Sequence, residues 1–210
     1  MNNTTKLLIA RHGNTFSPGE TVRRVGTTDL PLVESGLIQG KMLGHYLQKN
    51  NLIPDFIYTS TLKRAIQTAE SAQAVMQTNL PIELLYIFNE IDYGQDENQP
   101  EEKVVARLGK EALQAWETDA KVPQGWHVDP SSIIRNWQDF ALNITQHDAG
   151  KTILVITSNG IARFSPHLTG NFQAFAAHHG IKIATGALCI FETTPTENQW
   201  RCVQWNIKPA

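Results

Sequence analysis

Short apolar runs alternate along this chain with segments whose apolar residues recur at helical spacing. The runs Lys6–Ala10, Asp55–Thr59 and Thr152–Thr157 are typical of strands buried on both faces of a parallel sheet. Helical signals extend from about Glu34 to Lys49 and again over residues 62–76, where Ser60 or Thr61 is a candidate N-cap. The pattern therefore places helices between successive buried strands.

Weaker signals predict further elements. Pro81–Ile87 is a strand candidate, a helix is expected from Ile161 to Leu168, and the strands Lys182–Phe191 and Trp200–Ile207 close the chain. Strands that alternate with helices predict a three-layer α/β fold, with a mainly parallel central sheet and helices on both faces.

Residues 88–150 interrupt this alternation. They are polar and loop-rich at first, then helical, and they carry Trp116, Trp126 and Trp137, which we interpret as packing anchors. We expect an insertion of helices and loops over the C-terminal edge of the strands. No repeat, low-complexity tract or linker divides the chain, so residues 1–210 are predicted to form one domain.

Charge and composition exclude several classes of protein. Eighteen basic and twenty acidic side chains give a net charge of −2, so the chain has no overall attraction for nucleic acid or an anionic membrane. No apolar run approaches the roughly 18 residues of a membrane span, and the first ten residues do not resemble a signal peptide. We therefore expect a cytoplasmic protein in which Cys189 and Cys202 are free thiols, although the two could face each other across a late hairpin.

Polar clusters follow the three longest buried runs. Arg11 and His12 follow the first, Ser60 to Arg64 the second, and Ser158 with Asn159 the third. Ligands of open α/β sheets bind beyond the carboxyl ends of the strands, so these clusters are expected to meet in one pocket if the strands are neighbours.

The clustered residue types point to phosphate chemistry. Two guanidinium groups, of Arg11 and Arg64, can donate paired hydrogen bonds to a tetrahedral oxyanion. The imidazole of His12 can attack phosphorus, and a carboxyl group on a nearby loop, such as that of Glu90, can protonate the leaving oxygen.

These motifs, taken together, resemble the histidine phosphatase superfamily, the phosphoglycerate-mutase-like proteins. The resemblance spans Lys6 to about Arg163, with its motifs in the family's order. The matching segments are Arg11-His12-Gly13-Asn14-Thr15, Gly26 with Asp29-Leu30-Pro31-Leu32, Ser60 to Ala69 (STLKRAIQTA) and Phe88 to Gly94 (FNEIDYG). The resemblance implies that His12 is the phosphorylated nucleophile, Arg11 and Arg64 the phosphate clamp and Glu90 the proton donor. It places Asn14 and Tyr93 at the pocket rim in supporting roles.

The chain departs from the family pattern in one place. The family carries a second histidine in a Ser/Thr-His-Gly-Gly-x-Ile-Arg segment, where this chain has Ser158 in a gapless alignment or Asn159 after a shift of one residue. Either side chain can donate a hydrogen bond to phosphate, but neither supplies an imidazolium charge. Loss of one such donor typically costs about 3 kcal/mol, roughly a hundredfold in rate.

We therefore expect phosphate binding to persist and turnover to fall unless another group compensates. The histidines whose positions the sequence leaves open are His127, His147, His167, His178 and His179. The adjacent pair His178 and His179 lacks the cysteine or carboxylate spacing of a metal site, so no metal is expected.

The leading hypothesis is a metal-independent phosphomonoester hydrolase that acts through a phosphohistidine on a small phosphorylated metabolite, without a cofactor. A phosphate-binding relative of reduced activity is the first alternative. A phosphoglycerate-type mutase ranks below both, because residues 88–125 contain no arginine besides Arg107 to hold a substrate carboxylate. The oligomeric state stays open, with a homodimer among the alternatives.

Overall fold

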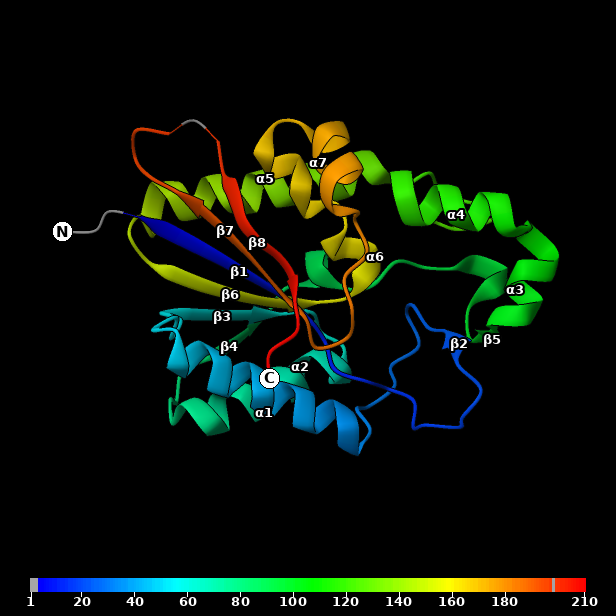
Figure 1. The fold of residues 1–210 in the computed structure, drawn as a ribbon, viewed down its shortest axis with the longest axis horizontal. Helices are drawn as coiled ribbons and strands as arrows, with labels where there is room; N and C mark the ends of the chain where they lie inside the picture. Colours follow the sequence, from blue (N-terminus) through cyan, green and yellow to red (C-terminus); the bar gives the residue numbers. More distant parts are fainter. Residues whose placement is uncertain (1–3, 198) are drawn as a thin grey trace.

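The computed structural model describes residues 4–197 and 199–210 (Figure 1). In the first half of the chain the elements are β1 (Thr5–Arg11), β2 (Arg23–Arg24), α1 (Glu34–Lys49), β3 (Phe56–Thr59), α2 (Lys63–Met76), β4 (Ile82–Leu84), the 3₁₀ helices η1 (Tyr86–Phe88) and η2 (Gly94–Asp96), and β5 (Gln99–Pro100). The second half contains α3 (Glu101–Leu108), α4 (Lys110–Asp119), α5 (Pro130–His147), β6 (Thr152–Thr157), α6 (Asn159–Ala162), the 3₁₀ helix η3 (Ser165–Thr169), α7 (Phe172–His179), β7 (Leu188–Thr193) and β8 (Arg201–Ile207).

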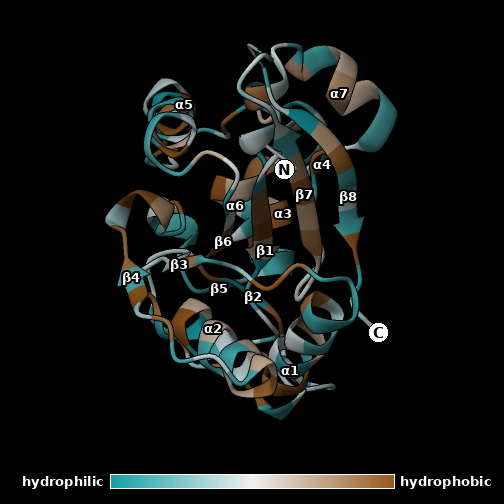
Figure 2. Cartoon of the chain, turned by 90° about the vertical axis from the view of Figure 1, so that its left-hand side faces the viewer, coloured by the Kyte–Doolittle hydropathy of each residue, from teal (hydrophilic) through white to brown (hydrophobic). Residues whose placement is uncertain are grey.

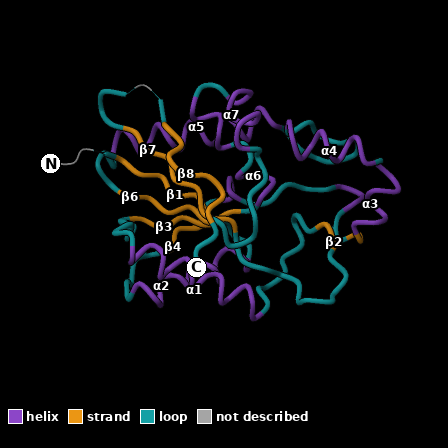
Figure 3. Tube along the Cα trace, viewed as in Figure 1, coloured by secondary structure: helices purple, strands orange, loops and turns teal. Residues whose placement is uncertain are grey.

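A six-stranded sheet forms the centre of the fold, in the order β4-β3-β6-β1-β7-β8 (Figure 3). The first four of these strands are parallel, and β7 runs antiparallel to both β1 and β8. The register pairs Arg11 with Thr157 and Thr59 with Ile156. The neighbouring strands β1, β6 and β3 therefore end at the same level, and the polar residues that follow them meet at one edge.

Alternating side chains of the strands build a core on each face of the sheet. Leu8 and Ala10 of β1 face one cluster with Leu43 of α1 and Ala69 of α2. Leu7 and Ile9 point the other way, into a cluster that contains residues of α5, α6 and η3. Figure 2 shows the sheet between α1 and α2 on one side and α5 on the other. The predicted α/β fold, with a mainly parallel sheet and helices on both faces, is confirmed.

The stretch 88–150 divides into two parts. The first part, with β5, α3 and α4, lies beyond the C-terminal ends of β1 and β6 (Figure 1). The second part is α5, which covers a face of the sheet and buries Trp137 beside Phe88. Trp116 and Trp126 pack edge to face, with ring centroids 5.4 Å apart, so all three tryptophans serve as packing anchors.

The prediction that Ser60 or Thr61 is the N-cap of α2 is wrong. The helix begins at Lys63 after an N-cap at Leu62, and its first N–H bonds Asp29 Oδ1 at 2.7 Å. Thr61 does not cap because its N–H and hydroxyl both bond the Asn89 side chain. Part of the cap thus comes from a residue 34 positions away, which local sequence could not indicate.

Three other boundaries differ from the predicted ones. The strand predicted over 81–87 pairs only over Ile82–Leu84, and η1 follows it. The helix predicted over 161–168 breaks into α6 and η3, since Pro166 lacks an N–H to continue an α-helix. The strand predicted from Lys182 starts at Leu188, because Gly186 bonds the carbonyls of Arg11 and His12 and the segment turns over the end of β1. Helix α7 was not predicted.

Among the described residues, no helix is both long and apolar enough to cross a bilayer. Cys189 and Cys202 are free thiols.

Candidate active site

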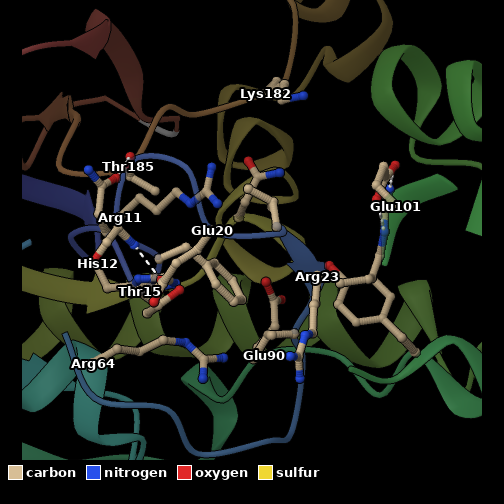
Figure 4. Close-up of a pocket in the computed structure, with 18 of the residues that line it drawn as sticks. Arg11, His12, Thr15, Glu20, Arg23, Arg64, Glu90, Glu101, Lys182 and Thr185 are labelled. Atoms are coloured by element: carbon tan, nitrogen blue, oxygen red, sulfur yellow. Dashed lines mark hydrogen bonds and ion pairs between the residues drawn. The ribbon is translucent and has the colours of Figure 1, made fainter. Parts of the chain in front are cut away.

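A cavity of about 760 Å³ opens at the C-terminal ends of β1 and β6 (Figure 4). Arg11, His12, Arg64 and Glu90 all line it, although the first and last of them are 79 residues apart in the chain. Figure 4 shows Arg11 and Arg64 approaching from opposite sides, with Glu90 across the cavity from the histidine. The fold thus gathers the predicted guanidinium groups, imidazole and carboxyl group in one place.

His12 is buried directly after β1, with an exposed fraction of 6%. Its Nδ1 lies 2.8 Å from the Gly13 carbonyl oxygen. A carbonyl only accepts, so Nδ1 carries the proton and Nε2 keeps its lone pair. Burial, together with the charges of Arg64 and Arg11, lowers the pKa of His12 well below its usual range. The ring is therefore a neutral base with Nε2 available for nucleophilic attack.

Arg11 is the last residue of β1. Only part of its guanidinium forms hydrogen bonds within the protein. Nη1 donates to the Ile183 carbonyl at 2.6 Å, whereas the buried Nε has no hydrogen-bond partner. Burial lowers the pKa of Arg11, and the Glu90 carboxylate opposes this effect. A buried donor without a partner is costly, which favours an anion at this position.

Arg64 lies in the first turn of α2 and is 1% exposed. Its Nη1 donates to the Thr28 carbonyl at 2.9 Å and its Nη2 to the Gly26 carbonyl at 2.6 Å. The Arg64 side chain is therefore directed into the protein and not into solvent. The loop that holds Arg64 also has no room for a side chain at Gly26, where a Cβ would lie 2.1 Å from the Ile91 oxygen.

The carboxylate of Glu97 holds this same loop from the other side. Glu97 accepts hydrogen bonds from the N–H groups of Gly26 and Thr28 and from the Thr28 hydroxyl, at 2.6–3.2 Å. The two residues whose carbonyls bind Arg64 are therefore fixed through their N–H groups by one carboxylate. Sequence reasoning missed this role, because Glu97 stands in an acidic stretch that reads as a solvated loop.

Glu90 is anchored at the opposite wall and is 7% exposed. Its Oε1 accepts from the Ile91 N–H at 3.0 Å, and its Oε2 accepts from the Gly160 N–H at 3.1 Å. The carboxyl group is thus oriented by backbone and lines the cavity that contains His12.

Ser158 and Asn159, the two alternatives predicted for the position of the second family histidine, have different surroundings. Asn159 lines the cavity, and its Oδ1 accepts from the Ile183 N–H at 2.9 Å, which leaves the amide NH₂ free to donate. Ser158 is fully buried, its Oγ has no partner, and it is not among the lining residues. Of the two alternatives, the structure brings Asn159 to the cavity wall.

Asn14 and Tyr93 also line the cavity. The Asn14 side chain donates to Ser35 Oγ at 3.2 Å and accepts from Thr185 Oγ at 2.5 Å, so it joins two loops around the cavity. None of the other described histidines lines the cavity. His127, for example, contacts Asp92 at 2.8 Å instead.

Further charged side chains line the cavity, and the sequence did not indicate that they would lie there. They comprise Glu20, Arg23, Arg24, Glu101, Glu117 and Lys182. The Arg23-Arg24 pair in a glycine-containing loop was the available signal, but only the fold shows that this loop faces His12.

The guanidinium groups of Arg11 and Arg64, the buried imidazole of His12 and the carboxyl group of Glu90 thus meet in one cavity at the end of a parallel sheet. The profile of the histidine phosphatase superfamily (branch 1) matches residues 7–208, and the chain belongs to this family.

Similar sequences include 2,3-bisphosphoglycerate-dependent phosphoglycerate mutases. The protein from Bifidobacterium longum is 31% identical over 129 residues, which is 61% of this chain and 52% of the relative. The protein from Baumannia cicadellinicola is 37% identical over 112 residues, 53% of this chain and 47% of the relative. The aligned part thus spans about half the length of these curated relatives.

Solved structures with the same fold include phosphatases and a mutase. A mycobacterial glucosyl-3-phosphoglycerate phosphatase superposes with a TM-score of 0.78 at 19% identity, over 97% of this chain and 99% of that one. A phosphoserine phosphatase from Entamoeba histolytica gives 0.74 at 19% identity, over 97% and 98%. A phosphoglycerate mutase from Bacillus anthracis gives 0.78 at 18%, over 97% and 93%. At these identities the likeness concerns the fold.

Proposed function

We propose that this protein is a metal-independent phosphomonoester hydrolase that acts on a small phosphorylated metabolite through a phosphohistidine at His12. The observation that carries the proposal is the state of that ring. Its Nδ1 is tied to Gly13 and its pKa is held low beside Arg11 and Arg64, so a neutral nucleophile lies within a cationic clamp. Relatives and neighbours named for small phosphorylated metabolites support the substrate class.

In the first step, the Nε2 lone pair attacks the phosphorus of the bound ester. A P–N bond forms, the P–O bond to the leaving group breaks, and the departing alkoxide takes the proton of the Glu90 carboxyl group. Arg11 and Arg64 stabilise the charge on the equatorial oxygens.

In the second step, water attacks the phosphohistidine. Its proton passes to the Glu90 carboxylate, the P–N bond breaks, and the electron pair returns to Nε2. Inorganic phosphate leaves, and Glu90 is again protonated. The NH₂ group of Asn159 donates to a phosphate oxygen in both steps, in place of the charged donor that the second family histidine supplies.

A neutral amide stabilises transition-state charge less than an imidazolium does. This difference favours an alternative function in phosphate binding. The protein would then be a phosphate-binding family member with little turnover. The mutase alternative differs in the fate of the phosphate, which would return to a bound substrate instead of passing to water.

Labelling separates these functions. The protein is incubated with radiolabelled acetyl phosphate and analysed for acid-labile, base-stable label. We expect label on the wild type and none on His12→Asn, with hydrolysis of a phosphomonoester panel lost in the same variant. His45→Asn, at an exposed position of α1, is the control. Phosphate binding without label would establish the phosphate-binding protein with little turnover. Transfer of the label to an added phosphoglycerate, and not to water, would establish the mutase.

A further inference from the structure

Thr68 is a fully buried residue of α2 that the reaction steps above do not use. Its hydroxyl donates to the Arg64 carbonyl oxygen at 2.7 Å and accepts from the Gly13 N–H at 3.0 Å. The first bond, to the residue four positions back, is common for a threonine in a helix. The second bond joins residues 55 positions apart, so the hydroxyl ties the start of α2 to the loop that carries His12.

The Gly13 N–H belongs to the peptide group between His12 and Gly13, and this group is held on both sides. Thr68 binds its N–H, and the Gly186 N–H donates to its oxygen, the carbonyl oxygen of His12, at 3.1 Å. The next carbonyl oxygen, that of Gly13, lies 2.8 Å from His12 Nδ1. The orientation of this peptide group therefore sets the backbone from which the imidazole projects and the acceptor that keeps the proton on Nδ1.

Contacts with α1 hold the same loop without the help of Thr68. A Cβ built at Gly13 would lie 2.4 Å from the Gly36 carbonyl oxygen, so the loop packs closely against the helix. The Asn14 N–H also bonds Gln39 Oε1 at 2.8 Å. We therefore expect the loop to stay in place when the Thr68 hydroxyl is removed. The buried Gly13 N–H would then lose its acceptor, which is costly, so we expect the peptide group to reorient.

We propose that Thr68 is a positioning residue that holds His12 in the orientation for attack on phosphorus, a role that rests on the hydrolase function above. Thr68 is not among the residues that line the cavity, so it acts through Gly13 and not on the substrate. The Arg64 guanidinium is bound independently, by two backbone carbonyls, so phosphate binding does not depend on the hydroxyl. A displacement of about 1 Å can cost roughly a hundredfold in rate. Loss of the hydroxyl therefore affects the chemical step and not the binding of phosphate.

Thr68→Val tests this role, because valine keeps the shape of the side chain without the hydroxyl. We expect the rate of phosphohistidine formation and kcat on phosphomonoesters to fall by about tenfold to a hundredfold. The inhibition constant of inorganic phosphate should stay within about threefold of the wild-type value. Rapid-quench labelling with radiolabelled acetyl phosphate measures the first step. Thr68→Ser restores a hydroxyl that can donate and accept, and should recover most of the rate.

Thr193→Val is the matched control for loss of a buried hydroxyl. Thr193 is buried, and its hydroxyl donates to the Gln199 carbonyl oxygen at 3.3 Å. It pairs with Thr5 at the start of β1, so it lies at the opposite end of that strand from His12. We expect Thr193→Val to lower the melting temperature and to leave kcat unchanged.

Three results would overturn the role of Thr68. The first is a Thr68→Val protein that behaves like this control, with a lower melting temperature and an unchanged rate. The second is a loss of rate that Thr68→Ser does not recover. The third is a phosphate inhibition constant that rises as much as kcat falls, because the hydroxyl would then act on the clamp and not on the nucleophile.

A measurement without turnover separates this role from the hydrolase function. Nitrogen chemical shifts of ¹⁵N-labelled histidine, assigned to His12 by comparison with His12→Asn, report which ring nitrogen carries the proton. We expect the Nδ1–H tautomer alone in the wild type at neutral pH, and a mixture with the Nε2–H tautomer in Thr68→Val. If the wild type is not labelled by acetyl phosphate, the hydrolase function fails and the spectra alone decide. A mixture in Thr68→Val then supports the role of Thr68, and an unchanged spectrum overturns it. If Thr68→Val does not fold, Thr68→Ala, with a residue that favours helix, takes its place in every measurement.

Discussion

The Gly160 N–H donates to Glu90 Oε2 at 3.1 Å, and a Cβ built at Gly160 would lie 2.2 Å from Glu90 Oε1. The absence of a side chain at Gly160 therefore allows its backbone to hold the proposed proton donor. The glycine is required for close approach, since a methyl group there would displace the carboxyl group or break the hydrogen bond.

We predict that Gly160→Ala loses activity through Glu90. Displacement of a general acid typically costs about a hundredfold or more, so kcat should fall by roughly this factor while inhibition by inorganic phosphate changes little. Steady-state kinetics and a phosphate inhibition constant measure the two effects. Glu90→Gln should show the same loss, and Gly160→Ala added to it should cost nothing further. A further large loss in the double variant would show that Gly160 acts elsewhere.

The local sequence indicated which residues would meet in this cavity, because they lie in short segments that follow buried strands. Arg11 and His12 follow β1 directly, so the end of a buried apolar run located them. Arg64 lies in the first turn of α2, and the helical pattern placed it at the same edge of the sheet. The register that brings the ends of β1, β6 and β3 to the same level is a finding of the structure.

Contacts over long separations could not be predicted in this way. Glu97 holds Gly26 across 71 residues, and Asp29 bonds the first N–H of α2 across 34. The sequence could not distinguish Ser158 from Asn159, because a shift of one residue in the alignment exchanges them. They lie at the end of β6, where the chain turns from a strand into α6. A local pattern does not contain the path of these loops, which is set by packing.

The buried neutral state of His12 gives the protein a defined acid sensitivity. Its pKa is lowered in the folded protein, so below the ordinary pKa of about 6.5 the unfolded chain binds a proton that the folded chain does not. Stability conferred by the neutral ring is present above that pH and lost as the pH falls. We predict that His12→Asn gains melting temperature relative to the wild type between about pH 7 and pH 5.

Thermal melts across this pH range measure the effect, with His45→Asn as the matched exposed control. The melting temperatures of the wild type and His45→Asn should fall in parallel as the pH decreases, whereas that of His12→Asn should fall less. Parallel behaviour of all three proteins would show that His12 titrates normally. The acid limb of kcat/KM should correspondingly lie below pH 6.5.

Glu97 is predicted to be a positioning residue for the phosphate clamp. Its carboxylate fixes the N–H groups of Gly26 and Thr28, whose carbonyls bind Arg64. Removal of a partner from buried donors costs about 1–3 kcal/mol, so Glu97→Ala should raise the phosphate inhibition constant about tenfold or more. Glu97→Gln keeps one acceptor oxygen and should recover part of the loss. If Glu97→Ala lowers the melting temperature but leaves the phosphate constant unchanged, the carboxylate has a structural role only.

Asn159 offers an isosteric test of the proposal that its amide donates to the bound phosphate. In Asn159→Asp the bond from the Ile183 N–H to Oδ1 is kept, but the free NH₂ becomes a carboxylate oxygen that faces the phosphate. A donor is thus exchanged for a like charge, and phosphate affinity should fall by about a hundredfold, while the melting temperature stays close to that of the wild type. Ser158→Ala removes a hydroxyl that lies outside the cavity lining and should change affinity by less than about threefold. Isothermal titration with inorganic phosphate compares the two variants. A larger loss in Ser158→Ala would mean that the serine donates to the anion, and that Asn159 merely ties α6 to the segment that carries Ile183.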